Sequence, residues 1–96
     1  MTRNEIRLIV IDTFHELLGT EDIENIDDYT DPNIDLGLDS HDGVEYACFL
    51  SRKLGFPFPF NRNPFRDDPD QPYRHVCDIV DLVQEIVSQH EKVNHV

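Results

Sequence analysis

The sequence predicts an all-α protein, an antiparallel bundle of three or four helices with a long first loop. Three stretches repeat apolar residues at the spacing of an amphipathic helix, and no stretch alternates as a half-buried strand does. The prolines and three of the four glycines, residues that end helices, lie between these stretches. Because the chain has 96 residues, residues 1–96 are expected to form one small domain.

The first predicted helix begins after Thr2 and ends at Gly19. Thr2 and Glu5 have the spacing of a capping box, and Gly19 is well placed to end the helix. The acidic connection that follows, residues 20–39, is too long to be a simple turn. We expect its apolar residues to lie on the helices: Ile23, Ile26, Tyr29, Ile34, Leu36 and Leu38.

The second predicted helix covers residues 40–54. Either Ser40 or Asp39 can accept a hydrogen bond from a free backbone N–H of its first turn. Asp42 and Glu45 complement the positive end of the helix dipole. The apolar stripe of this helix is formed by Tyr46, Ala47, Leu50 and Leu54.

Residues 56–74, hereafter segment 56–74, contain five of the six prolines and four of the six phenylalanines. Proline excludes a regular helix over most of this segment, although a helical turn fits residues 64–68. We interpret its aromatic residues mainly as core and loop packing: Phe56, Phe58, Phe60, Phe65 and Tyr73. The last predicted helix covers about residues 75–89, and residues 91–96 are expected to fray.

The net charge of −12 disfavours a nucleic-acid partner, because phosphates would be repelled, and favours basic proteins or simple solubility. Cys48 and Cys77 form no C-x-x-C pair, so we expect two reduced thiols packed as small hydrophobes in a cytoplasmic protein. No segment has the apolar length of a membrane span, and the first apolar run does not indicate a signal peptide. The histidine spacings match no standard zinc pattern, so no metal site is predicted.

Ser40 is the candidate functional residue. A serine that opens a helix is usually a cap. Its surroundings, G-L-D-S-H, are not the G-x-S-x-G of a hydrolase, and the sequence places no histidine and carboxylate around it as a triad. A self-contained nucleophile is therefore not supported, and no catalytic residue is predicted.

Three motifs occur in order along the chain: D-L-G-L-D-S at 35–40 with D-G-V-E at 42–45, L-G-F-P-F-P at 54–59, and R-H-V-C-D-I-V-D-L-V at 74–83. With these motifs the chain resembles the acyl carrier protein family over most of its length. The resemblance implies that Ser40 carries a 4′-phosphopantetheine arm, attached from coenzyme A by a separate phosphopantetheinyl transferase. The thiol of the arm would hold acyl groups as thioesters for fatty-acid, polyketide or related lipid synthesis. The protein would then be a monomeric carrier and not an enzyme.

A phosphodiester at a helix N-terminus would meet free N–H groups and the positive end of the helix dipole. The resemblance also implies that acyl-loading and acyl-accepting enzymes recognise this helix through basic patches, with five contact residues: Asp39, His41, Asp42, Val44 and Glu45. The family usually has leucine where this chain has His41, and residues 60–74 are longer than its usual third-helix region. Both departures indicate a specialised member.

Two alternatives stay open. The chain could be an unmodified acidic helical adaptor that binds a basic protein, with Ser40 only as a cap and the acidic residues only as a solvated face. The aromatic residues of segment 56–74 could instead form an exposed docking patch or a lid over an acyl chain. An acyl chain could also insert between the helices.

Overall fold

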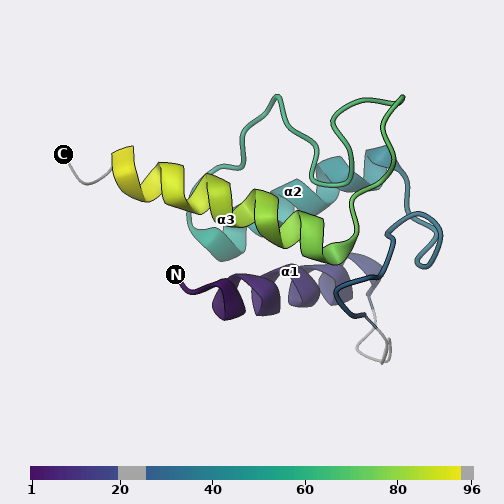
Figure 1. Cartoon of the computed structure of the whole chain (residues 1–96), viewed down its shortest axis with the longest axis horizontal. Coiled ribbons are helices and arrows are strands. Elements are labelled where there is room, and N and C mark those ends of the chain that lie inside the picture. Colours follow the sequence, from purple (N-terminus) through teal and green to yellow (C-terminus); the bar gives the residue numbers. More distant parts are fainter. Residues whose placement is uncertain (20–25, 94–96) are drawn as a thin grey trace.

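The computed structural model describes residues 1–19 and 26–93. These residues form three helices and no strand: α1 (Arg3–Leu18), α2 (Ser40–Leu54) and α3 (Val76–Val93). The prediction of an all-α protein is confirmed (Figure 1). The helical turn considered for residues 64–68 is not formed, since those residues are bends and irregular chain.

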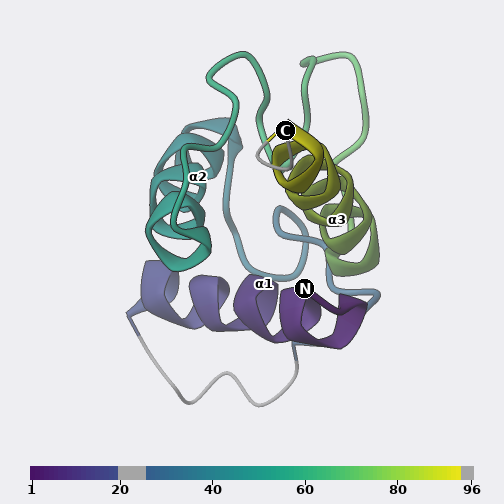
Figure 2. The same ribbon diagram turned by 90° about the vertical axis from the view of Figure 1, so that its left-hand side faces the viewer.

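Helix α1 packs against both of the other helices. In Figure 1, α2 and α3 both begin at the end of the molecule where α1 finishes, so both run against α1. Figure 2 shows α2 and α3 standing apart on one side of α1. Since α2 and α3 run in broadly the same direction, only their pairings with α1 are antiparallel. The chain therefore needs the long segment 56–74 to return from the end of α2 to the start of α3.

The local signals for helix ends act as predicted. The Thr2 hydroxyl accepts a hydrogen bond from the Glu5 amide, and the Glu5 carboxylate accepts one from the Thr2 amide. Gly19 has a left-handed backbone (φ 71°) and donates its N–H to the last turn of α1. Gly55 ends α2 in the same way, with φ 82°. Helix α3 continues to Val93, four residues beyond its predicted end at position 89, and residues 94–96 of the predicted tail lie outside the described residues.

The centre of the core is a group of three aromatic rings from three parts of the chain. Phe14 of α1 lies 4.6 Å from Tyr46 of α2, measured between ring centroids. Phe65 of segment 56–74 lies 5.7 Å from Phe14 and 5.1 Å from Tyr46. All three side chains are fully buried, and the Tyr46 hydroxyl donates to the Val10 carbonyl at 2.7 Å. Segment 56–74 is thus part of the fold as well as a connection.

The prediction of aromatic packing is confirmed for four of the five residues in segment 56–74 and wrong for the fifth. Phe58 and Phe65 are buried, and Phe56 and Tyr73 pack partly buried against the core. Phe60, in contrast, is completely exposed. Its neighbours on either side are Pro59 and Asn61, in a turn that projects from the core.

The first loop follows the prediction in part. Leu38 is buried, and Ile26 and Leu36 pack against the core, whereas Tyr29 and Ile34 are each 81% exposed. Ile23 lies outside the described residues. The loop also provides carbonyls for the start of α3: Thr30 accepts from the Val76 amide at 3.0 Å, and Asp28 accepts from the Cys77 amide at 2.9 Å. Hydrogen bonds to the free amides at the start of α3, together with the burial of apolar side chains, therefore hold this loop in place.

Two further expectations can be compared with the structure. Cys48 is exposed, so the prediction that both cysteines pack as small hydrophobes is wrong for this residue. Cys77 is partly buried, and this burial raises the pKa of its thiol. Among the described residues, no helix has the length and apolar character needed to cross a membrane.

Candidate functional site

The first turn of α2 is capped by Asp39 and not by Ser40. Asp39 Oδ1 accepts hydrogen bonds from the amides of His41 at 2.9 Å and Asp42 at 3.2 Å. In return, the Asp42 carboxylate accepts one from the Asp39 amide at 2.9 Å. This decides between the two caps that the sequence allowed. The Ser40 hydroxyl, at the first helical position, is left free for other contacts.

The cap also changes the expected anion site at this helix start. The amides of His41 and Asp42 bind Asp39 Oδ1, and the Gly43 amide binds the Asp39 carbonyl at 3.2 Å. The expectation that free N–H groups would receive a phosphodiester is therefore wrong for these three donors. The hydrogen bond from the Asp42 amide is the main reason that the pKa of Asp39 is lowered. Asp39 consequently stays ionised beside Ser40 at neutral pH.

The Ser40 hydroxyl contacts two residues of segment 56–74. Arg66 Nε donates a hydrogen bond to Ser40 Oγ at 3.1 Å, and the Tyr73 hydroxyl lies 3.4 Å from the same oxygen. The Arg66 guanidinium stacks on the Tyr73 ring, 4.2 Å from its centroid. The sequence predicted no role for Arg66, and for Tyr73 it predicted packing or, as an alternative, part of a docking patch or lid. Nothing in the local pattern could have found this contact, because the residues are 26 and 33 positions from Ser40.

Asn63 fastens segment 56–74 to the start of α2. Its Nδ2 donates to the Ser40 carbonyl at 2.9 Å, and its Oδ1 accepts from the Phe65 amide at 2.9 Å. Gly43 makes this approach possible, because a Cβ at that position would collide with the Asn63 side chain. The glycine of the D-G-V-E motif is therefore explained by close packing against the first turn of α2.

An ion-pair cluster stiffens the same segment. Asp67 accepts from Arg62 Nε at 3.0 Å and also pairs with Arg74. Partial burial acts to raise the pKa of Asp67, but the hydrogen bonds from the two arginines outweigh it and hold the pKa well below its usual range. Arg74 Nη1 also donates to the Asn63 carbonyl at 2.8 Å. The cluster thus fixes the residues on either side of Arg66.

The five predicted contact residues lie together at the N-cap and on the first two turns of α2. They differ in exposure and in whether their side chains are already hydrogen-bonded. His41 and Glu45 are exposed, and Val44 is 61% exposed. The carboxylates of Asp39 and Asp42 are engaged in the reciprocal cap. Glu45 is therefore the one carboxylate of the three with no hydrogen bond or ion pair among the described residues.

A depression of about 280 Å³ begins one helical turn after Ser40. Positions 40, 44 and 51 of α2 follow one another at spacings that place them on one face of a helix. The depression is lined by residues of this face and of the chain after α2: Val44, Ala47, Cys48, Ser51, Phe58, Pro59, Phe60 and Arg62. Exposed Phe60 is part of this lining.

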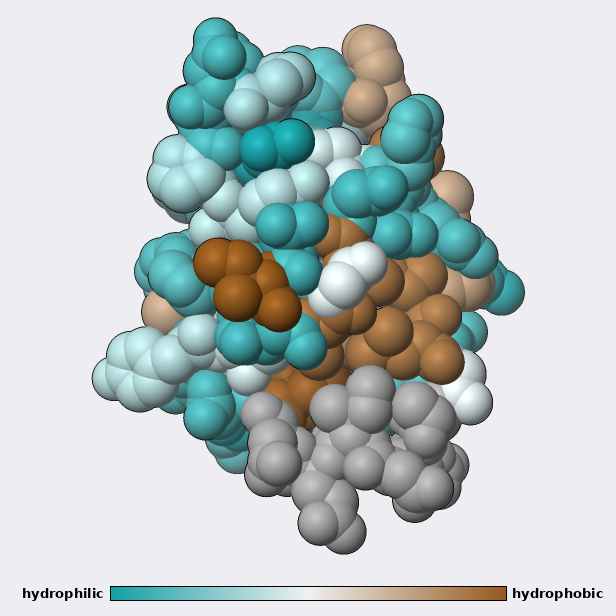
Figure 3. Space-filling model, turned by 90° about the vertical axis from the view of Figure 1, so that its right-hand side faces the viewer, coloured by the Kyte–Doolittle hydropathy of each residue, from teal (hydrophilic) through white to brown (hydrophobic). Residues whose placement is uncertain are grey.

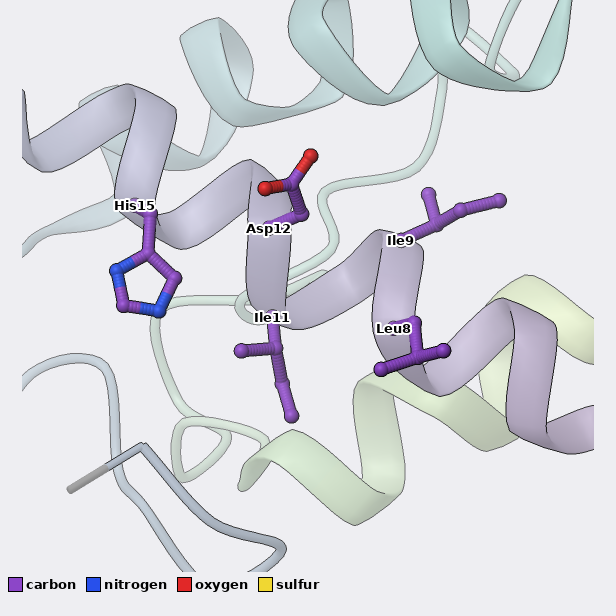
Figure 4. Close-up of a pocket in the computed structure, with 5 residues that line it drawn as sticks. All are labelled: Leu8, Ile9, Ile11, Asp12 and His15. Carbon is purple, nitrogen blue, oxygen red and sulfur yellow. The ribbon is translucent and has the colours of Figure 1, made fainter. Parts of the chain in front are cut away.

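A second depression, of about 370 Å³, lies on α1 alone and has five lining residues: Leu8, Ile9, Ile11, Asp12 and His15. Figure 4 shows Leu8, Ile11 and His15 on one side of the helix and the other two side chains pointing elsewhere. Because no residue of α2 lines it, this depression is not continuous with Ser40. Figure 3 shows the face at the right-hand side of Figure 1. Its upper part is mostly hydrophilic, and a hydrophobic area lies below.

Searches for similar proteins give no assignment for this site. No family model, curated protein or solved structure matches the chain. Among the described residues, no three histidines, cysteines or carboxylates lie close enough together to hold a metal ion. The interpretation of the site therefore depends on Ser40 and its neighbours.

Proposed function

We propose that the chain is an acyl carrier protein whose 4′-phosphopantetheine arm is attached to Ser40. One observation carries the proposal. Because Asp39 provides the cap, the serine of D-L-G-L-D-S has no role in starting the helix. A half-buried hydroxyl at a loop–helix junction, which local structure does not require, is suited to accept a group from another enzyme.

The carrier needs no catalytic base of its own, because the transferase removes the proton of the hydroxyl. The 280 Å³ depression along α2 is where the outer part of the arm or a short acyl chain would lie, between Val44 and Phe60. Insertion of an acyl chain between the helices stays a prediction. His41, Val44 and Glu45 are the exposed residues of α2 that a basic-surfaced partner would contact first.

An intact-mass measurement tests the proposal. The purified chain is incubated with coenzyme A and a phosphopantetheinyl transferase of broad specificity. The wild type should gain one phosphopantetheinyl group, Ser40→Ala should gain none, and the control Ser88→Ala should behave as the wild type. Ser88 is an exposed serine of α3.

Ser40→Ala should keep its helical circular dichroism, because the Asp39 cap remains. The loss of one hydrogen bond should lower the free energy of unfolding by about 0.5–1.5 kcal/mol. A wild type that no transferase modifies, or a Ser40→Ala chain that is still modified, would contradict the proposal.

A second function, that of an unmodified acidic adaptor, is favoured by a different observation. Ser40 Oγ already accepts a hydrogen bond from Arg66, so the serine can be explained as a tie between α2 and segment 56–74. The net charge of −12 would then serve only to bind a basic protein. The mass measurement separates the two functions, since an adaptor gains no group.

A further inference from the structure

We propose that Arg66 is a positioning residue that binds the phosphodiester on Ser40 and thereby fastens the root of the arm to segment 56–74. The inference rests on the proposed function. It assigns a phosphate-binding role to a residue that lies outside the motifs that resemble the carrier family. Three features of the described residues support it: the orientation of the guanidinium, the local charge, and the use of the amides at the helix start.

The guanidinium is held with one edge towards Ser40. Arg66 Nη1 donates to the Pro69 carbonyl at 3.2 Å, with the Gln71 carbonyl at 3.5 Å, and the Tyr73 ring supports the flat face. Nε donates to Ser40 Oγ, and Nη2 has no partner among the described residues. Nε and Nη2 form one edge of the fork, and such an edge binds two oxygens of a phosphate in parallel.

The charge of Arg66 is also available. Its two neighbouring arginines, Arg62 and Arg74, both pair with Asp67. Arg66 contacts no carboxylate within the described ranges, and its positive charge faces the serine. This contrast indicates that the cluster around Asp67 serves the structure of the segment, whereas Arg66 serves Ser40.

A phosphate on Ser40 would need such a cation. The ionised carboxylate of Asp39 lies at the same helix start, and three of the amides that could offset it are occupied by Asp39 itself. The dipole of α2 favours the anion but supplies no free donor from these three amides. Arg66 is the side chain that already donates to the oxygen where the phosphate would be attached.

The attachment step leaves this donor in place. The Ser40 hydroxyl loses its proton to the transferase, an Oγ–P bond forms, and the P–O bond to the nucleotide half of coenzyme A breaks. The nucleotide half leaves with the bridging oxygen. Oγ becomes an ester oxygen, a weak acceptor, and the Arg66 N–H groups then bind the charged phosphate oxygens one bond further out.

The test compares apo and holo forms of four chains: wild type, Arg66→Gln, Arg66→Lys and the control Arg52→Gln. Arg52 suits the control because it also stacks on an aromatic ring, 4.7 Å from the centroid of Phe49, and lies three turns from Ser40. Intact mass first establishes that each chain is modified. The measured quantity is the change in thermal unfolding midpoint on modification, which removes any difference between the apo chains.

Modification should raise the midpoint of the wild type and of Arg52→Gln by roughly 4 °C, the scale of one charge-assisted hydrogen bond in a domain of this size. The rise should disappear in Arg66→Gln. It should fall by about half in Arg66→Lys, which keeps the charge and loses the fork. The ³¹P resonance of the arm should also shift and narrow in Arg66→Gln, because a released phosphate moves faster.

Two results overturn the inference in distinguishable ways. If every chain gains the arm and Arg66→Gln is stabilised as much as the wild type, Arg66 does not bind the phosphate and the proposed function stands. If the wild type gains no mass, the proposed function and the role of Arg66 fail together.

Discussion

Helices α1 and α2 start with the same device but meet different surroundings. Each has a reciprocal capping box, formed by Thr2 and Glu5 in α1 and by Asp39 and Asp42 in α2. The residue after the first cap, Arg3, reaches outward to Asp81 of α3 at 2.7 Å. The residue after the second cap, Ser40, is too short to reach any helix and is itself contacted by segment 56–74.

This difference shows that the residues that start a helix do not determine what its first side chain contacts. A cap accounts for where each helix begins, and it leaves the next side chain to be explained by its neighbours. Arg3 forms an exposed ion pair, and a pair of this kind contributes little to the free energy of unfolding. The contacts of Ser40 cannot be explained from its own helix, because they come from Arg66 and Tyr73 of segment 56–74. That segment packs over the start of α2 because its own residues are buried there. Two substitutions test how that segment and the helix start depend on each other, and a third tests recognition of α2.

The largest expected effect is that of removing the buried ring that anchors segment 56–74. Phe65→Ala should lower the free energy of unfolding by about 3–5 kcal/mol, because the fully buried Phe65 ring packs against both Phe14 and Tyr46. Phe60→Ala is the matched control in the same segment, and its fully exposed ring should change stability by less than about 0.5 kcal/mol. Urea unfolding measures both. If both substitutions lowered the free energy of unfolding equally, segment 56–74 would be only a connection and would not form part of the core.

The next effect concerns the close approach of segment 56–74 to α2. Gly43→Ala should lower the free energy of unfolding by about 1–3 kcal/mol, because the new Cβ collides with an Asn63 side chain that is hydrogen-bonded at both ends. Alanine otherwise favours a helix over glycine by about 1 kcal/mol. In an Asn63→Ala background, Gly43→Ala should therefore become neutral or stabilising. A double-mutant cycle without this change of sign would contradict the packing account.

The smallest expected effect is on recognition of α2. Glu45→Lys should slow modification by a basic-surfaced transferase about two- to fivefold, the value of one exposed charge pair, and added salt should reduce the difference. Glu45 is the appropriate residue because Asp42→Lys would also break the cap. Glu85→Lys makes the same charge change on α3 and should have no effect on the rate. Equal rates for all three chains would mean that the acidic face is only solvated.

The helix starts and stops could be predicted from local sequence because their causes are local. Thr2 with Glu5, and Gly19 and Gly55, act within a few residues of where they stand. Exposure in the loops could not be predicted in this way. Tyr29 and Phe60 are as apolar as their buried counterparts, and only the path of the chain decides which ring reaches the core. The relative directions of α2 and α3 also depend on that path.

Local sequence was enough to predict that three amphipathic stretches become helices and that an acidic α2 begins at Ser40, because periodicity and capping are short-range effects. Local sequence could not distinguish Asp39 from Ser40 as the cap, because both residue types cap helices well, and the fold has Asp39 in that role. Only the tertiary structure decided that Arg66 donates to Ser40 across 26 positions of chain. That contact exists because burial of Phe65 and the small size of Gly43 bring segment 56–74 against the helix start, and the residues around Ser40 do not reveal which distant residues pack against them.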